Sequence, residues 1–162
     1  MSGLLDGINI LDLSRILAGP YTAQMLSDLG ANITKIEAPW GDDTRGWGPP
    51  FATDFDGERV AAYFLCCNRG KTILQINLKE EKDRLMELIE WADVIVENFK
   101  PGTLERLIGP LPKDTIVCSI SGYGATGPRR DEPGYDLALQ ARSGIMSLSL
   151  IHISEPTRPV MI

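Results

Sequence analysis

The sequence predicts an α/β protein in which helices cover both faces of a parallel sheet. Short runs rich in β-branched and aliphatic residues alternate along the chain with segments whose apolar residues recur at helical spacing. The 162 residues are 43% hydrophobic, which is enough for one compact core and too little for two large domains. Because strands that alternate with helices usually pair in parallel, this order predicts one α/β domain.

The first strand, helix and strand form one βαβ unit. Residues 8–13 are mainly aliphatic and predict a strand. Gly19 and Pro20 then break the strand, and Pro20 suits the first turn of a helix. The helix is expected over residues 21–29, and a second strand over residues 32–36.

Later segments repeat this pattern. They predict strands over residues 72–77, 94–97 and 115–120 and helices over residues 80–91, 103–107 and 135–143. Two long loops interrupt the pattern, at residues 38–51 and 121–136. The first carries two tryptophans and three prolines, so we expect it to pack on the domain. The second is rich in glycine and proline, which permits its backbone to approach a ligand closely.

Composition excludes several classes of partner. The formal net charge of −6 leaves no broad basic face for nucleic acid. No apolar run reaches membrane-spanning length, and Asp6 and Asp12 lie where a signal or transit peptide would avoid acids. We therefore expect a cytoplasmic protein that binds neither nucleic acid nor a membrane.

Histidine and cysteine limit the possible chemistry. The one histidine is His152, so a Ser-His-Asp or Cys-His nucleophile and a histidine-based zinc site each lack a component. Cys66 and Cys67 are adjacent and Cys118 is remote, which is neither a disulfide framework nor a metal-ligand spacing. We expect no metal and three buried thiols. Any reaction would use carboxylates, amines, hydroxyls or backbone amides.

Five cations lie near predicted strand ends. They are Arg69, Lys71, Lys79, Lys100 and Arg106. Each by itself is typical of a solvated surface charge. Together, at one edge of a parallel sheet, they could hold a phosphorylated ligand without a basic overall surface. Such sheets bind ligands at the carboxyl ends of their strands.

Other candidate residues have two interpretations each. Glu37 lies where a dinucleotide site would bind ribose, but residues 18–20 lack the glycine fingerprint and can equally form a simple turn, which disfavours NAD. Phe99 can plug the core or contact a ligand. Asp136 can cap its helix or take part in chemistry.

Five stretches resemble the family III coenzyme A transferases, which include formyl-CoA, carnitine-CoA and succinyl-CoA-dependent dicarboxylate enzymes. They read, in order, "LDGINILDLSRILAGPYTAQMLSDLGANITKIEAP", "GDDTRGWGPPF", "CNRGKTILQINLK", "ADVIVENFKPGTLER" and "SISGYGATGPRRDEPGYDLALQARSGIMS". The resemblance covers residues 4–149 nearly without gaps. Within the family, the second stretch and "SISGYGATGP" are most similar to the succinyl-CoA:dicarboxylate branch.

This resemblance implies a truncated Rossmann-like domain over residues 1–149, with a coenzyme A thioester as substrate and no other cofactor. The residues it implies at the coenzyme site are Leu17, Ala18, Asn77, Leu78, Lys79, Asn98, Phe99, Lys100, Arg106, Pro133, Gly134, Tyr135 and Asp136. Residues 133–136 would line the thioester end. Ala38 stands where a relative has arginine, which leaves Lys79 or Arg106 to meet a phosphate. The absent side chain of Gly19 would leave room for the coenzyme.

The resemblance also implies a reaction between an acyl-CoA and a small carboxylic acid. An aspartate attacks the thioester and forms an acyl anhydride and then an aspartyl-CoA thioester, while backbone amides stabilise the oxyanions. Coenzyme A would pass from succinyl-CoA to a dicarboxylate such as glutarate. The aspartate belongs after the "SGIMS" helix and has no counterpart here, so we expect this chain to be inactive by itself.

Two further expectations follow from the resemblance. Residues 150–162 have no family counterpart and are expected to be a non-native tail. The full-length form would be an interlocked homodimer. A non-catalytic module that binds acyl-CoA or a nucleotide remains the alternative.

Overall fold

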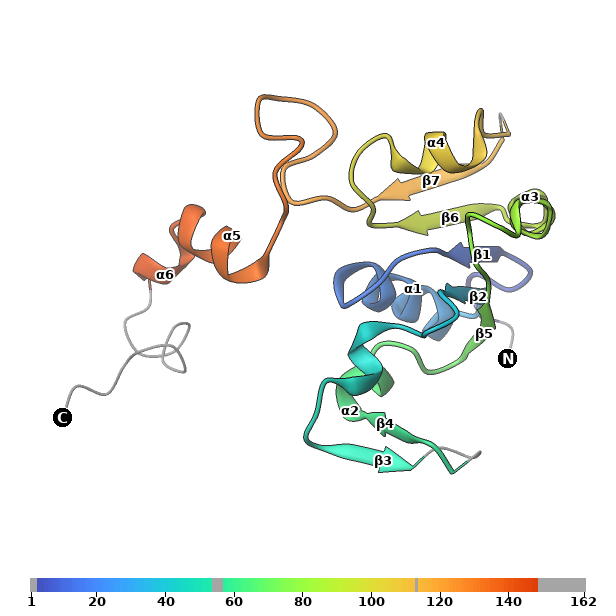
Figure 1. The fold of residues 1–162 in the computed structure, drawn as a ribbon, viewed down its shortest axis with the longest axis horizontal. Coiled ribbons are helices and arrows are strands. Elements are labelled where there is room, and N and C mark those ends of the chain that lie inside the picture. Colours follow the sequence, from blue (N-terminus) through green and yellow to red (C-terminus); the bar gives the residue numbers. More distant parts are fainter. Residues whose placement is uncertain (1–2, 54–56, 113, 149–162) are drawn as a thin grey trace. The chain divides into compact units, whose positions relative to one another are not determined.

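The computed structural model describes residues 3–53, 57–112 and 114–148. The chain divides into two compact units, residues 1–120 and residues 121–162, and their positions relative to one another are not determined (Figure 1). The expected tail over residues 150–162 lies outside the described residues and stays a prediction.

A five-stranded parallel sheet forms the centre of the first unit. Its strands are β1 (Asn9–Asp12), β2 (Asn32–Glu37), β5 (Lys71–Gln75), β6 (Val94–Glu97) and β7 (Ile116–Ser119). Their order is β5-β2-β1-β6-β7, and every neighbouring pair is parallel. The chain thus winds outward from β1 through β2 to β5, and then returns beside β1 to continue through β6 to β7 (Figure 1).

Helices cover both faces of this sheet, which confirms the predicted fold class. Successive residues of β6 point to opposite faces, because side chains alternate along a strand. Val96 packs in the cluster that contains Ala23 of α1 (Ala18–Asp28). Ile95 packs in the other cluster, with residues of α3 (Lys82–Trp91) and α4 (Thr103–Ile108). The predicted strands and helices are all present, with ends shifted by up to three residues.

Between β2 and β5 the described residues, 38–53 and 57–70, form four short elements that the sequence pattern does not predict. They are η1 (Asp43–Gly46), β3 (Phe51–Thr53), β4 (Arg59–Ala61) and α2 (Ala62–Leu65), and β3 pairs with β4 antiparallel. Tertiary contacts hold them: the Arg45 guanidinium lies 3.9 Å above the centre of the Phe64 ring. The loop therefore packs on the domain as expected, although Trp40 and Trp47 remain 75% and 50% exposed.

Residues 121–148, the described part of the second unit, form a long loop followed by two short helices. These are α5 (Asp136–Arg142) and α6 (Ile145–Leu148). Among the described residues of the whole chain, no helix has the length and apolar character needed to cross a membrane.

Candidate functional site

The loops that follow β1 and β6 lie at the switch point of the sheet. These two strands are neighbours, but the connections that follow them lead to opposite sides of the sheet. In open α/β sheets, ligands bind outside the carboxyl ends of the strands at such a point. The β1 loop leads to Leu17 and Ala18, which are both exposed, and the β6 loop carries residues 98–100. The fold thus brings these five predicted site residues to adjacent loops.

Asn98 joins the two loops. Its Oδ1 accepts a hydrogen bond from the Arg15 backbone N–H at 2.9 Å, and its Nδ2 donates to the Arg15 carbonyl at 2.7 Å. The oxygen and the nitrogen of the Asn98 side-chain amide therefore both bind the backbone of Arg15. Phe99 is half-buried against the core, which favours the packing interpretation for its ring, while Lys100 is exposed.

The loop after β5 lies at the same edge of the sheet, two strands away from β1. Asn77 Oδ1 accepts from the Lys79 N–H at 3.2 Å, and the Asn77 N–H donates to Glu81 Oε1 at 2.9 Å. Leu78 packs against the core. These contacts shape the loop and leave Lys79 exposed to solvent.

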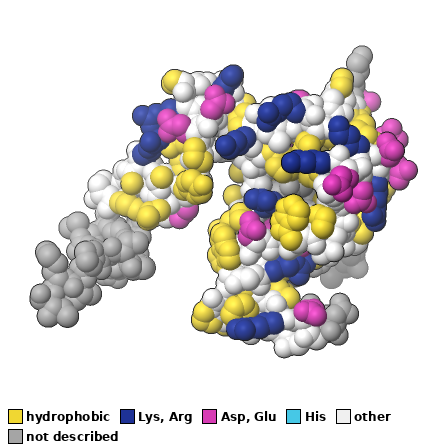
Figure 2. Space-filling view, viewed as in Figure 1, with side chains coloured by type: hydrophobic (Ala, Val, Ile, Leu, Met, Phe, Trp, Pro, Cys, Tyr) yellow, Lys and Arg dark blue, Asp and Glu magenta, His cyan; other side chains and the backbone are white. Residues whose placement is uncertain are grey.

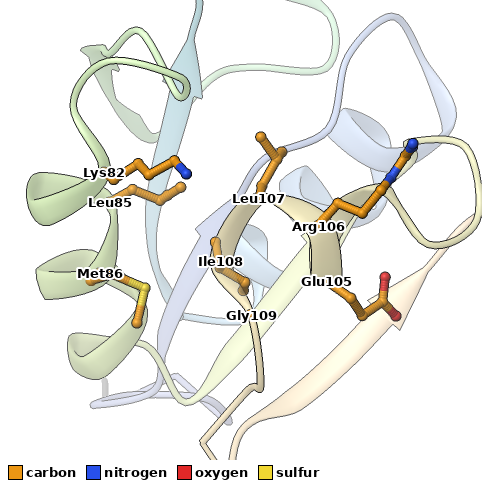
Figure 3. Close-up of a pocket in the computed structure, with 8 residues that line it drawn as sticks. All are labelled: Lys82, Leu85, Met86, Glu105, Arg106, Leu107, Ile108 and Gly109. Atoms are coloured by element: carbon orange, nitrogen blue, oxygen red, sulfur yellow. The ribbon is translucent and has the colours of Figure 1, made fainter.

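Arg106 lies on α4 beside a pocket of about 290 Å³ between α3 and α4. The pocket is lined by Lys82, Leu85, Met86, Glu105, Arg106, Leu107, Ile108 and Gly109. Figure 3 shows the α3 side chains projecting toward α4. The Arg106 guanidinium donates to the Gly102 carbonyl at 3.1 Å and to Thr103 Oγ1 at 3.0 Å, and the residue is exposed. It therefore keeps donors available to an anion.

Two of the five predicted cations are not available at this edge. Lys71 is the first residue of β5 and its side chain is fully buried, so the expectation of a solvated charge is wrong. Its Nζ donates to Asp12 Oδ2 at 2.8 Å and to Asn68 Oδ1 at 3.0 Å. Burial lowers the pKa of Lys71, although the charge of Asp12 acts in the opposite direction. Arg69 follows α2 instead of a strand and pairs with Asp28 at 2.5 Å.

A second buried ion pair lies beneath the β1 loop and was not predicted. Lys35 of β2 donates to Asp42 Oδ2 at 3.1 Å and to the Ser14 carbonyl at 2.8 Å, and neither side chain of the pair is more than 1% exposed. Burial alone would raise the pKa of Asp42. Hydrogen bonds from Thr44 and the charge of Lys35 outweigh burial and leave this pKa below its usual value. A lysine inside the apolar run "ITKIE" was the signal that could have indicated the pair.

Glu37 and Gly19 have roles inside the protein. Glu37 is buried and binds Arg45 through both carboxylate oxygens, at 2.8 and 3.0 Å, which opposes a role with ribose. Gly19 is also buried, and a methyl group there would overlap the side chain of Ser14. Its absent side chain therefore makes room for Ser14, and the expectation that it makes room for the coenzyme is wrong.

The remaining predicted site residues, 133–136, lie in the second unit and are all exposed. Gly134 packs its Cα against Gly122, and a methyl group on either would overlap the other. Asp136 Oδ2 accepts from Gln140 Nε2 at 2.6 Å, and its side chain does not cap α5. The shared role of these residues with the loops of the first unit stays a prediction.

Charged side chains do not gather into one large patch on the visible face of the first unit. Figure 2 shows basic side chains interspersed with acidic and apolar ones. Among the described residues, no group of three or more histidine, cysteine, aspartate or glutamate side chains is arranged to hold a metal ion.

We expect iodoacetamide at pH 8 to alkylate Cys66 well before Cys67. Cys66 is exposed, which corrects the expectation of buried thiols, whereas Cys67 is buried. Burial, reinforced by Cys66, raises the pKa of Cys67 to about 11, so roughly 0.1% of it is thiolate at pH 8. Tandem mass spectrometry of the labelled peptide measures the difference. In the control C66S, Cys67 should still react slowly; equal labelling of both thiols would contradict the structure.

The doubly wound sheet and the adjacent loops at its switch point define the class of protein: a Rossmann-like α/β domain. Comparison with known proteins narrows this class. The sequence model of CoA-transferase family III matches residues 5–162. The chain belongs to this family of enzymes.

Individual relatives agree with this assignment. A succinate–glutarate CoA-transferase from Agrobacterium fabrum is 44% identical over 155 residues, covering 90% of this chain and 39% of that protein. The succinyl-CoA:glutarate CoA-transferase of Mus musculus is 42% identical over 164 residues, covering 96% and 36%. The crystal structure of a CAIB/BAIF family protein from Brucella suis matches with a TM-score of 0.85 and 46% identity, covering 92% and 41%. The chain thus spans roughly two fifths of the length of these relatives.

Proposed function

We propose that this chain binds a coenzyme A thioester at the carboxyl edge of its sheet, as the coenzyme-binding part of a transferase that moves coenzyme A from succinyl-CoA to a dicarboxylate such as glutarate. The observation that carries the proposal is the meeting of the β1 and β6 loops at the switch point, in a chain more than 40% identical to succinyl-CoA:glutarate enzymes. Cytoplasmic location and an interlocked homodimer belong to the same proposal.

The exposed cations have the chemistry that the phosphates of coenzyme A require. Lys79 and Arg106 both reach solvent, and Arg106 adjoins the pocket between α3 and α4. Charge-assisted hydrogen bonds to phosphate are stronger than neutral ones. Leu17 and Ala18 would meet the pantetheine end, since an apolar surface suits its chain, and residues 133–136 would line the thioester.

In the proposed reaction an aspartate carboxylate attacks the thioester carbonyl and expels the coenzyme A thiolate, leaving a mixed anhydride. The thiolate then attacks the aspartyl carbonyl and releases succinate, which leaves an aspartyl-CoA thioester for the incoming dicarboxylate. Neither Asp12 nor Asp42 suits this role, because both are buried and bound to lysine. We propose that these 162 residues bind the coenzyme without completing the transfer.

Isothermal titration calorimetry tests the binding site. Coenzyme A should bind and NAD should not. Both R106A and K79A should weaken coenzyme A binding about tenfold, because each removes a charge-assisted contact. The matched control R69A removes an exposed cation that pairs with Asp28 and precedes β5, away from the carboxyl ends of the strands, and its affinity should equal that of the wild type. Equal affinity for NAD, or equal losses in all three variants, would contradict the proposal.

A turnover assay tests the proposal that the chain does not complete the transfer. The wild-type chain, incubated with succinyl-CoA and isotope-labelled glutarate, should yield no labelled glutaryl-CoA above the uncatalysed level, although it binds coenzyme A. Labelled thioester formed in proportion to protein concentration would show that a carboxylate of this chain is the nucleophile. Asp136 would then be the first candidate, and D136N should abolish the exchange.

A further inference from the structure

Side chains form hydrogen bonds with almost every backbone N–H and carbonyl group of residues 14–16, in the β1 loop. Asp12 Oδ1 accepts from the Ser14 N–H at 3.0 Å, and the buried amine of Lys35 donates to the Ser14 carbonyl at 2.8 Å. At the next residue, Asn98 binds both the N–H and the carbonyl of Arg15. Backbone groups in loops are usually left to solvent, so this arrangement indicates a loop with one specified conformation.

Ile16 adopts a strained conformation within this segment. Its φ is +71°, and it is the one non-glycine residue with positive φ that the described part of the chain contains. A β-branched side chain disfavours this region strongly, and such outliers persist only where the surroundings determine them. Asp42 Oδ2 accepts from the Ile16 N–H at 3.4 Å, so the carboxylate that pairs with Lys35 also faces the strained residue.

The buried pair thus contacts the loop on both sides of Arg15. Lys35 binds the carbonyl before it, and Asp42 binds the N–H after it. Asp42 is itself oriented by the N–H and hydroxyl of Thr44, at 3.0 and 2.7 Å. A buried ion pair contributes little net stability compared with an apolar pair of similar volume, because both ions lose their hydration. Its position against the strained backbone indicates a role in specifying conformation.

We propose that Lys35 and Asp42 are positioning residues that hold residues 14–16 in the conformation required for coenzyme A binding, so that Leu17 and Ala18 meet the ligand without a prior rearrangement. This inference rests on the proposed function. A loop held in its bound conformation loses less conformational entropy when the ligand binds. Loss of the pair therefore weakens binding even though neither side chain touches the coenzyme.

The test compares D42N with E37Q in the full chain. Both variants replace a buried carboxylate with an amide of similar shape. Glu37 binds Arg45 and accepts from the Asp42 N–H at 3.1 Å, an acceptor role that the glutamine oxygen keeps, but it does not hydrogen-bond to residues 14–16 as Asp42 does. D42N should weaken coenzyme A binding about tenfold in calorimetry and speed hydrogen exchange of the Ile16 amide about tenfold or more, whereas E37Q should change each by less than about twofold. Circular dichroism should show that both variants remain folded.

Two further variants separate positioning from general stability. I16G accepts positive φ without strain, so D42N should cost less affinity in the I16G background than in the wild type. If D42N does not fold, T44V removes one hydrogen bond that orients Asp42 and should reproduce the effect at about threefold. Equal losses of affinity in both backgrounds, or unchanged affinity in D42N and T44V, would overturn the proposal.

Failure of the proposed function is recognised separately. If the wild-type chain does not bind coenzyme A, the proposed function is wrong, and hydrogen exchange alone decides the role of the pair. Slow exchange of the Ile16 amide in the wild type and E37Q, with fast exchange in D42N, would retain the pair as the device that holds the loop. If the Ile16 amide exchanges at the same rate in the wild type, E37Q and D42N, the buried pair does not hold the loop either.

Discussion

Replacing Lys35 with methionine should lower the free energy of unfolding by about 3–5 kcal/mol, which is the usual cost of removing one partner of a buried ion pair. The methionine side chain fills much of the volume of the aliphatic part of lysine but has no hydrogen-bond donor. Asp42 would then be a buried carboxylate without its cation, and the Ser14 carbonyl would lose its hydrogen bond. Urea denaturation followed by tryptophan fluorescence measures the change.

Two controls distinguish the loss of the pair from the loss of a lysine. The double variant K35M/D42L replaces both ions with apolar groups and should recover part of the lost stability, because no buried charge remains unpaired. The recovery is incomplete because Thr44 and the Ile16 N–H lose the carboxylate that accepts their hydrogen bonds. K79M removes an exposed lysine and should change stability by less than about 0.5 kcal/mol. The interpretation fails if K35M and K79M are equally stable.

Replacing Ile95 with alanine should lower the free energy of unfolding by about 2–5 kcal/mol. Ile95 is fully buried in β6, in the cluster that joins the sheet to α3 and α4. The truncation removes apolar contacts and leaves a cavity that the surrounding strands and helices can only partly fill. The loop after this strand carries residues 98–100, so thermal denaturation with and without coenzyme A should show whether ligand binding offsets part of the loss.

The matched control is I116A. Ile116 lies on the neighbouring strand β7 and pairs with Val94, but it is 65% exposed. Its truncation leaves no buried cavity and should cost less than about 1 kcal/mol. A loss for I95A no larger than that for I116A would contradict the placement of Ile95 in the core.

The candidate site could be predicted only in part. Residues 98–100 follow a strongly apolar strand, so the sequence placed them correctly at its carboxyl end. The conformation of the β1 loop could not be predicted, because Asn98 stands 83 positions away from Arg15, whose backbone it binds. The short elements between β2 and β5 escaped prediction for the same reason: contacts such as Arg45 over Phe64, and not local periodicity, hold them.

The sequence by itself determined the alternation of strands and helices, because the burial of apolar side chains follows a period that a few neighbouring residues already display. The sequence also indicated the family, because the five stretches that resemble family III coenzyme A transferases occur along the chain in the same order. Only the tertiary structure decided which charged residues are buried. Lys71 has the sequence context of a surface residue, yet its amine lies against Asp12, 59 positions away. Burial of an ion depends on a partner and on hydrogen bonds that the folded chain brings from distant segments, and no local pattern specifies them.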